Sequence, residues 1–157
     1  MLENLKVVDL TIPLGPQTIM WPGSQPPEAE TVVTIAHDGH FARRVSFYEH
    51  TGTHFDAPCH FVNGATTVDK IPATSLVKPA IVIDISKRIG IDTLGIDSGG
   101  VTTFPVHATV SHPKGLWHLE NLQNLKMLPP IRAWIVVGVL PLIDGSGSPA
   151  RVFALVP

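Results

Sequence analysis

The chain has a single cysteine, Cys59, among 157 residues. One thiol cannot form a disulfide within the chain, so a disulfide-stapled secreted scaffold is excluded. Proteins of reducing compartments rarely contain disulfides, so we expect a cytoplasmic location. Cys59 lies between Pro58 and His60, and we interpret it as a small buried hydrophobic residue and not as a nucleophile.

Charge of either sign is also scarce. Charged residues make up 15% of the chain, and its 11 basic and 13 acidic side chains form no runs and give a formal net charge of −2. Nucleic acids and anionic membranes attract concentrated positive charge, so we expect neither as a partner. Apolar runs stay shorter than the ~18 residues of a membrane span, and the first residues do not resemble a signal peptide.

Long uninterrupted segments are missing, because 15 prolines and 13 glycines punctuate the chain. Helices of any length have little room between them, whereas the β-branched runs that remain favour strands. The length suits one globular domain over residues 1–157. We therefore predict a mostly β fold with few helices, and strands near 5–12, 31–36, 42–48, 80–85, 89–96, 133–140 and 151–156.

Against this background, the segment HTGTHFDAPCH, from His50 to His60, contains three of the eight histidines. His50, His54 and Asp56 are separated by even numbers, so on a strand their side chains would share one face. A fully extended strand would still hold the two imidazoles ~13 Å apart, whereas ligands approach one ion to ~2.0–2.2 Å. Gly52 can adopt a positive φ, and we expect the segment to fold back there so that the side chains converge.

Two imidazoles and one carboxylate would give a divalent metal three protein ligands. Catalytic zinc sites typically use three protein ligands and leave a position for water, whereas structural sites close with four. Such an ion lowers the pKa of its water to about 7. His60 then remains as a candidate acid or base, since an imidazole titrates near working pH. A hydrogen-bonding surface loop is the alternative interpretation of the same residues.

A second polar group lies downstream, where His107 and Glu120 are set among apolar residues. A carboxylate in apolar surroundings is costly unless it is paired or bound to metal, so Glu120 is a candidate ligand. We interpret His112 and His118 as lying on the surface or just behind the ligands. Trp21, in a proline-rich loop, either anchors local packing or contacts a ligand.

The segment HTGTHFDAPCH resembles the His-x-Gly-Thr-His-x-Asp-x-Pro-x-His signature of the cyclase-like metal-dependent hydrolases, which include bacterial kynurenine formamidase and isatin hydrolase. Further pieces agree in order along nearly the whole chain. They are VDLTIPL and MWPG near the start, GIDTLGID in the middle, FPVH followed by LENLQNL, and GSGSPARVFAL at the end.

The resemblance implies roles for individual residues. His60 corresponds to the acid/base of the family, and Trp21 to a tryptophan that lines the substrate pocket. Phe55 and Phe61 flank the site, and either could pack a planar substrate or belong to the core. The metal ligands implied for one or two ions, with Asp56 as the bridge, are His50, His54, Asp56, His107 and Glu120.

The resemblance also implies a mixed α/β fold, mostly β, similar to the swivelling β/β/α architecture with a barrel-like centre, and a homodimer. The reaction would be attack of metal-bound hydroxide on the amide of a small aryl formamide such as N-formylkynurenine. The ion would be Zn²⁺, with Mn²⁺ as the alternative, because nitrogen and oxygen ligands do not separate the two. A lactam hydrolase with one manganese ion, similar to isatin hydrolase, is a further possibility.

Two features depart from the family pattern. Only Ser86, Lys87 and Arg88 separate two of the expected strands, where the family has a longer block, so we expect the sheet to lack a strand and expose an edge. A non-catalytic binding or assembly module is the alternative function that this favours. His107 and Glu120 are also one residue farther apart than the family spacing, and His112 could replace His107 as a ligand.

Overall fold

The computed structural model describes residues 4–81 and 91–157. Helical segments in these ranges are short turns, as the many prolines and glycines require. They are α1 (Ile35–Asp38), η1 (Pro58–His60), η2 (Val68–Lys70), η3 (Ala73–Ser75), the π-helical η4 (Val106–Ser111), η5 (His112–Lys114) and η6 (Leu125–Met127). In the described part of the chain we find no helix that is both long and apolar enough to cross a membrane.

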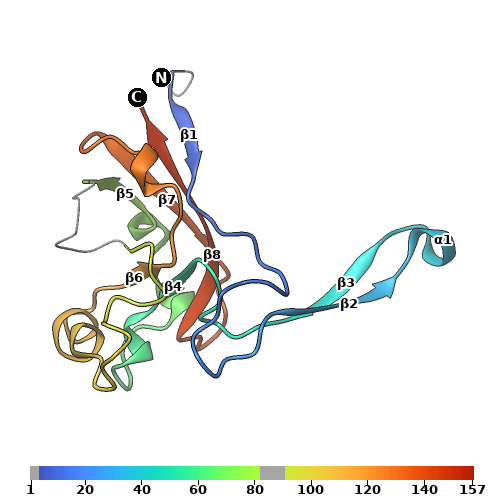
Figure 1. The fold of residues 1–157 in the computed structure, drawn as a ribbon, viewed down its shortest axis with the longest axis horizontal. Coiled ribbons are helices and arrows are strands. Elements are labelled where there is room, and N and C mark those ends of the chain that lie inside the picture. The colour runs from blue at the N-terminus through green and yellow to red at the C-terminus, as the bar shows by residue number, and fades with distance from the viewer. Residues whose placement is uncertain (1–3, 82–90) are drawn as a thin grey trace.

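The strands form one curled antiparallel sheet and one separate hairpin (Figure 1). The sheet has the order β5-β7-β8-β4-β6, and β1 pairs with β8 beside this path. Its members are β1 (Lys6–Asp9), β4 (His54–Asp56), β5 (Val77–Ala80), β6 (His118–Glu120), β7 (Ala133–Val139) and β8 (Gly147–Val156).

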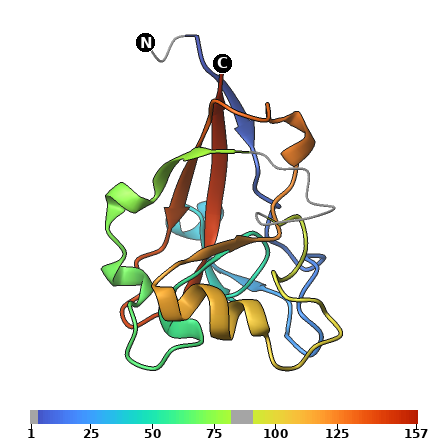
Figure 2. The same cartoon turned by 90° about the vertical axis from the view of Figure 1, so that its left-hand side faces the viewer.

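Strand β8 connects the two halves of the sheet. Its later residues lie between β1 and β7, with Phe153 opposite both Asp9 and Val136. Its first residues pair instead with β4, where Gly147 is opposite Asp56. The strand therefore holds β4 and β6 at the end of the sheet that is remote from the two chain ends, beside the helical turns η4 and η5 (Figure 2).

The core lies on the inner side of this curled sheet. Alternation along β8 buries Val152, Ala154 and Val156 there, while intervening residues such as Arg151 face outward. Other strands and loops complete it with Val8, Leu10, Phe55, Ala57, Val68, Leu122, Leu128, Ala133, Val137 and Ala150.

The hairpin stands apart from this body (Figure 1). Strands β2 (Glu28–Val33) and β3 (Ala42–Ser46) pair only with each other among the described residues, and α1 forms their tip. We call residues 28–46 the arm. None of the residues of the arm is buried in this chain.

The predicted fold class is confirmed: the described chain is mostly strand, with a curled half-barrel sheet and few helices. Details differ. The strand expected at 31–36 ends at Val33, because Ile35–Asp38 forms a helical turn that Gly39 ends with φ 75°. Residues 91–96 of the strand expected at 89–96 form bends, and residues 82–90, with the short Ser86–Arg88 junction, lie outside the described ranges. The last strand begins at Gly147, before the expected Arg151.

Candidate metal centre

The pairing of β4 with β6 builds the floor of the site. His54 lies opposite Glu120, and Asp56 lies opposite His118. Because side chains alternate along a strand, these four point to one face of the sheet and Phe55 points to the other. Phe55 is 0% exposed and packs on Trp117, with ring centroids 5.1 Å apart. The expectation that Phe55 contacts a substrate is therefore wrong for this structure, which places it in the core.

Gly52 folds the chain as the sequence predicts. Its φ is 62°, a conformation that side chains rarely adopt, and an added Cβ would lie 2.4 Å from Leu14 Cδ2. Thr51 fixes one flank by donating to the Tyr48 carbonyl at 2.6 Å, and Thr53 fixes the other by donating to the Asn121 carbonyl at 2.6 Å. The turn brings the imidazoles of His50 and His54 to 5.3 Å between ring centroids.

Two histidines have their outer ring nitrogens held by groups that can only accept a hydrogen bond. His54 Nδ1 donates to the Gly52 carbonyl at 2.8 Å, and His107 Nδ1 donates to the Asp97 carboxylate at 2.5 Å. The hydrogen of each neutral ring is therefore committed to Nδ1, and Nε2 presents a lone pair. A fixed outer hydrogen bond of this kind is typical of histidines that bind metals.

His50 is held in the opposite sense. The Ser146 hydroxyl donates to Glu49 at 2.6 Å, so it accepts from His50 Nε2 at 3.0 Å. The inner nitrogen, Nδ1, then faces Asp56 Oδ1 at 2.7 Å. Two acceptors at this distance need a cation between them, and either a proton on Nδ1 or a metal ion supplies it.

The inner nitrogens meet the two buried carboxylates. His54 Nε2 lies 3.2 Å from Asp56 Oδ1 and 3.4 Å from Glu120 Oε2. His107 Nε2 lies 3.3 Å from Asp56 Oδ2 and 3.1 Å from Glu120 Oε1. The five residues predicted as metal ligands, His50 included, thus converge, and the longer His107 to Glu120 spacing does not separate these two.

The electrostatics of this convergence favour cations. Burial by itself lowers the pKa of His54 and His107, but hydrogen bonds to Asp56 and Glu120 outweigh it and raise both to about 10. Burial opposes ionisation of the carboxyl groups, yet the surrounding imidazoles lower the pKa of Asp56 far below its ordinary range and lower that of Glu120. The ion-free cluster therefore retains protons at the positions that a metal would take.

The donor set fits a divalent metal. His54, Asp56 and Glu120 offer ligand atoms within 4.8 Å of one another, and so do His50, Asp56 and His60. Imidazole nitrogens mixed with carboxylate oxygens suit Zn²⁺ and Mn²⁺. The hydrogen-bond scheme agrees, because the inner nitrogens of His54 and His107, once they give up their protons, present lone pairs beside the carboxylates.

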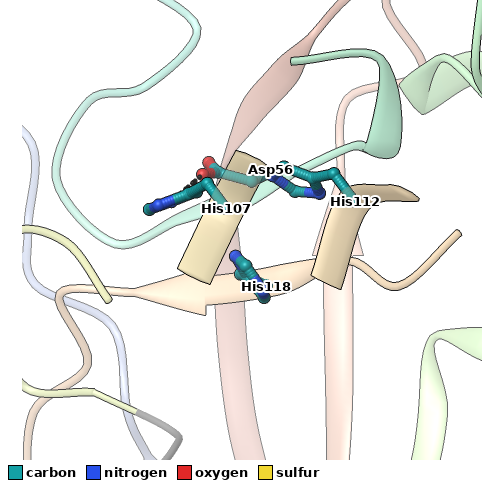
Figure 3. Close-up of side chains that lie close together, drawn as sticks. All are labelled: Asp56, His107, His112 and His118. Atoms are coloured by element: carbon teal, nitrogen blue, oxygen red, sulfur yellow. Dashed lines mark ion pairs between the residues drawn. The ribbon is translucent and has the colours of Figure 1, made fainter. Parts of the chain in front are cut away.

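His112 and His118 also belong to this cluster (Figure 3). They are 1% and 8% exposed, so the surface position considered for them is wrong. His112 Nε2 and His118 Nδ1 are buried, and neither has a hydrogen-bond partner in the described part of the chain. An unpaired buried polar group costs about 1–3 kcal/mol. Such a cost indicates that a further group belongs beside them.

His60 lies at the open side of the cluster. Its ring stacks on His50 with centroids 3.8 Å apart. Burial among protein atoms and the neighbouring imidazole of His50 lower its pKa to about 4, so it is neutral at pH 7. A neutral imidazole at this position can accept a proton, as its predicted acid/base role requires.

A cavity of about 350 Å³ opens above His60 and the metal cluster. Three aromatic rings form part of its wall: Phe104 lies 5.9 Å from Trp21 and 5.5 Å from Phe61, measured between ring centroids. The sequence left Trp21 and Phe61 open between packing and ligand contact, and the structure places both in the lining of the cavity. The remaining lining includes Ile19, Tyr48 and Leu94.

Sequence reasoning missed two residues of the site. Asp97 accepts the backbone N–H groups of Val106 and His107 at 2.8 and 3.1 Å as well as the His107 ring, so it sets both the start of η4 and the tautomer of the ligand. Phe104 has a φ of 46°, which is costly for a residue with a side chain. Its position before Pro105 is the signal that could have drawn attention to it, since a following proline restricts the backbone.

Comparisons with known proteins agree with this site. A family model described as "Putative cyclase" matches residues 8–109. Kynurenine formamidase from Bacillus cytotoxicus is 34% identical over 141 residues, which is 89% of this chain. Kynurenine formamidase from Geobacillus thermodenitrificans is 36% identical over 104 residues, which is 64% of this chain.

The chain spans 64% of the length of the Bacillus relative and 50% of the Geobacillus relative. Among solved structures, isatin hydrolase A from Labrenzia aggregata bound to benzyl benzoate superposes with a TM-score of 0.85 at 25% identity. That match covers 97% of this chain and 94% of the other. The fold is therefore shared over the body that carries the histidine cluster.

Proposed function

Because the chain belongs to the cyclase family, we propose that it is a metal-dependent hydrolase that cleaves the amide bond of a small aryl formamide such as N-formylkynurenine. The observation that carries this proposal is the geometry around Asp56. Inner nitrogens of His54 and His107 lie 3.2 and 3.3 Å from its two carboxylate oxygens, at the floor of a cavity with aromatic walls. The name of the B. cytotoxicus relative supports the substrate class.

The ion would be held by the residues that converge on this carboxylate. We propose Zn²⁺ as the ion and Mn²⁺ as the alternative. A bound divalent ion supplies Lewis acidity, which polarises a carbonyl oxygen and acidifies water. The proposed ligands, for one or two ions, are His50, His54, Asp56, His107 and Glu120.

His60 would move the protons. It is neutral at pH 7 because its pKa is about 4. At the edge of the cavity, one of its ring nitrogens lies within 4.8 Å of a ligand atom of Asp56 and of one of His50. In the proposed reaction it accepts a proton from the attacking water and returns it to the amide nitrogen as the C–N bond breaks. Formate and the free arylamine leave as products.

The cavity would orient the substrate through its aromatic ring. Trp21, Phe61 and Phe104 present flat faces around a volume of about 350 Å³, which is the size of a small-molecule site. Ring stacking on these side chains would place the formyl group over the histidine cluster. An aliphatic formamide has no ring to stack, so we expect it to bind more weakly.

A second candidate reaction is opening of a lactam ring. The close superposition with isatin hydrolase A favours it, since that protein shares the fold at 25% identity. Both reactions attack a carbonyl bonded to an aryl nitrogen, so the same residues would serve either. The two differ in their products, because a formamide gives formate and a separate arylamine, whereas a lactam gives one ring-opened acid that keeps the amine.

We further propose that residues 1–157 act as one hydrolase domain and pair as a homodimer through the arm. Two-stranded hairpins are marginally stable alone in water, and the arm exposes Val32, Ile35, Phe41 and Val45. A second copy of the chain would cover these residues. Sedimentation analysis of the intact chain tests this, and a monomer at micromolar concentration would contradict it.

The test of function uses the whole chain, stripped with a chelator and reloaded with Zn²⁺ or Mn²⁺. N-formylkynurenine and isatin are supplied separately, and formate and isatinate are measured as the two products. We expect formate release that depends on the added ion and is weaker with N-formylglycine. Folded, ion-loaded protein that releases neither product would overturn the proposal.

A further inference from the structure

More imidazoles surround Asp56 than the family ligand set uses. His107, His112 and His118 each offer a ring nitrogen within 4.8 Å of the others and of an Asp56 oxygen (Figure 3). In the figure the four side chains lie close together, and they come from β4, from the helical turns η4 and η5, and from β6. Nothing in the proposed reaction requires His112 or His118.

The helical turns after Pro105 explain how these rings meet. Segment η4 is a π-helix, in which residues five apart lie one above the other. His107 and His112 are five apart, and their ring centroids are 5.5 Å apart. His118 joins from β6, where it lies opposite Asp56 across the pair of strands. Its ring centroid is 4.7 Å from that of His112.

The free nitrogens of these rings face the cluster. His112 Nδ1 donates to the Leu116 carbonyl at 3.0 Å, which commits the ring hydrogen and leaves a lone pair on Nε2. That Nε2 is buried without a partner in the described chain, and so is His118 Nδ1. Both side chains are more than nine-tenths buried, so bulk water does not satisfy these nitrogens.

We propose that His107, His112 and His118, with Asp56 Oδ2, bind a divalent transition metal at a nitrogen-rich site of their own. Asp56 then bridges two positions, because Oδ1 faces His50 and His54 while Oδ2 faces His107. In this arrangement Glu120 is a ligand of the first ion, with His54 and Asp56. The proposal concerns metal binding and does not depend on the hydrolase reaction.

The chemistry of the donors selects the occupant. An anion would be repelled by the carboxylates of Asp56 and Glu120. Mg²⁺ and Ca²⁺ prefer oxygen ligands, whereas three imidazoles and one carboxylate suit Zn²⁺, Co²⁺ or Ni²⁺. The outer hydrogen bonds of His107 to Asp97 and of His112 to Leu116 orient the rings as metal-binding histidines are oriented.

The test loads the chelator-stripped whole chain with Co²⁺, counts ions by elemental mass spectrometry and records the visible spectrum of the bound cobalt. The double variant His112→Gln, His118→Gln should bind about one ion fewer per chain than the unaltered protein and lose the bands of its nitrogen-rich site. The matched control is His37→Gln, His40→Gln, which replaces two exposed histidines of the arm and should change neither readout.

An unchanged ion count and spectrum in the double variant would overturn the proposal and leave Glu120 as the ligand beside His107. If that variant does not fold, the unaltered Zn²⁺-loaded protein answers the question through imidazole ¹⁵N NMR. The proposal predicts metal-shifted nitrogens on His112 and His118, and ordinary shifts there contradict it. Unaltered protein that binds the second ion but does not hydrolyse formamides would overturn the proposed function and leave this metal site standing.

Discussion

The tip of the arm and the surroundings of Asp56 use the same residue type in opposite ways. Two of the eight histidines, His37 and His40, lie exposed at the tip. Within the described ranges, the one side-chain hydrogen bond of either is between His40 Nδ1 and the Asp38 carbonyl. The other six gather around Asp56, and His50, His54, His60 and His107 among them line one cavity. The number of histidines therefore does not predict a metal site. The two groups differ in the side chains and carbonyl groups that lie beside each ring.

Around Asp56, each fixed outer hydrogen bond decides which nitrogen faces inward. The Gly52 carbonyl, the Asp97 carboxylate and the Leu116 carbonyl do this for His54, His107 and His112. The buried carboxylates of the described residues are Asp56, Asp97 and Glu120, and all three belong to the cluster and not to the tip of the arm. Convergence of lone pairs on a buried carboxylate, and not the number of imidazoles, distinguishes a metal centre from a polar surface.

Removing one inner ligand should have the largest effect. In His54→Ala, Asp56 and Glu120 lose the imidazole whose Nε2 lies 3.2 and 3.4 Å from them. We expect the first ion to be lost on dialysis and formamide hydrolysis to fall to background. Elemental mass spectrometry and a formate assay measure both, and undiminished metal with normal turnover would show that His54 is not a ligand.

The next effect should come from His60, which lies at the rim and outside the buried floor. His60→Ala should keep the ions but lower kcat by ~10²–10⁴, the usual contribution of a general acid or base. The control is the metal content of the same preparation. A variant with an unaltered rate would remove the proton-transfer role from His60.

Two phenylalanines near the cluster, Phe55 in β4 and Phe61 after η1, should separate stability from binding. Phe55→Ala empties a fully buried position and should lower the free energy of unfolding by about 3–5 kcal/mol. Phe61→Ala removes a ring from the cavity wall and should raise KM for an aryl formamide with a smaller loss of stability. Chemical denaturation and steady-state kinetics measure the two effects. A Phe55→Ala variant with unchanged stability and a raised KM would contradict the placement of Phe55 in the core.

Removing the ions should make stability depend on pH in both directions. The pKa values of His54 and His107 are raised to about 10 from 6.5, so their stabilising contribution is complete below pH 6.5 and is lost as the pH rises toward 10. Those of His60 and His118 are lowered to about 4, so their contribution is complete above pH 6.5 and is lost as the pH falls toward 4.

The chelator-treated protein should therefore have its highest thermal midpoint near pH 6.5. With Zn²⁺ bound, the midpoint should fall less on the alkaline side, because the ion replaces the protons that His54 and His107 would lose. Calorimetric scans from pH 4 to 10, with and without the ion, measure this. If the thermal midpoint falls equally at alkaline pH with and without Zn²⁺, the ion does not take the place of the protons on His54 and His107.

The smallest effect is expected at the tip of the arm. His37→Gln with His40→Gln should leave metal content, turnover and thermal midpoint unchanged, because both rings are exposed and surface changes are usually worth less than about 0.5 kcal/mol. Any loss of metal in this variant would break the distinction between the two groups of histidines.

Much of the site could be predicted from sequence, because its parts are local. The even spacing of His50, His54 and Asp56 and the freedom of Gly52 indicate a folded-back loop, and the φ of 62° confirms the turn. Phe55 shows the limit of that reasoning. Its odd position between two ligands predicts the opposite face of a strand, but only the pairing of β4 with β6 and β8 shows that this face is the core.

The long-range parts could not be predicted in the same way. Nothing in the spacing of His107, His112 and His118 reveals a π-helix, and the residue that accepts the first N–H groups of this helix, Asp97, lies about ten residues earlier in the chain. The pattern around Ala133–Val139 identified a strand, whereas the β8 register that carries β4 depends on contacts across the whole sheet. The cytoplasmic location and the homodimer stay predictions.

The central claim is that the histidine cluster around Asp56 is a metal centre. Elemental mass spectrometry tests it most directly, on the whole chain purified without a metal-affinity tag, stripped with a chelator, reloaded with Zn²⁺ and dialysed. The account predicts at least one tightly held ion per chain, and a second one if His112 and His118 act as ligands. Folded protein that retains no ion would contradict it.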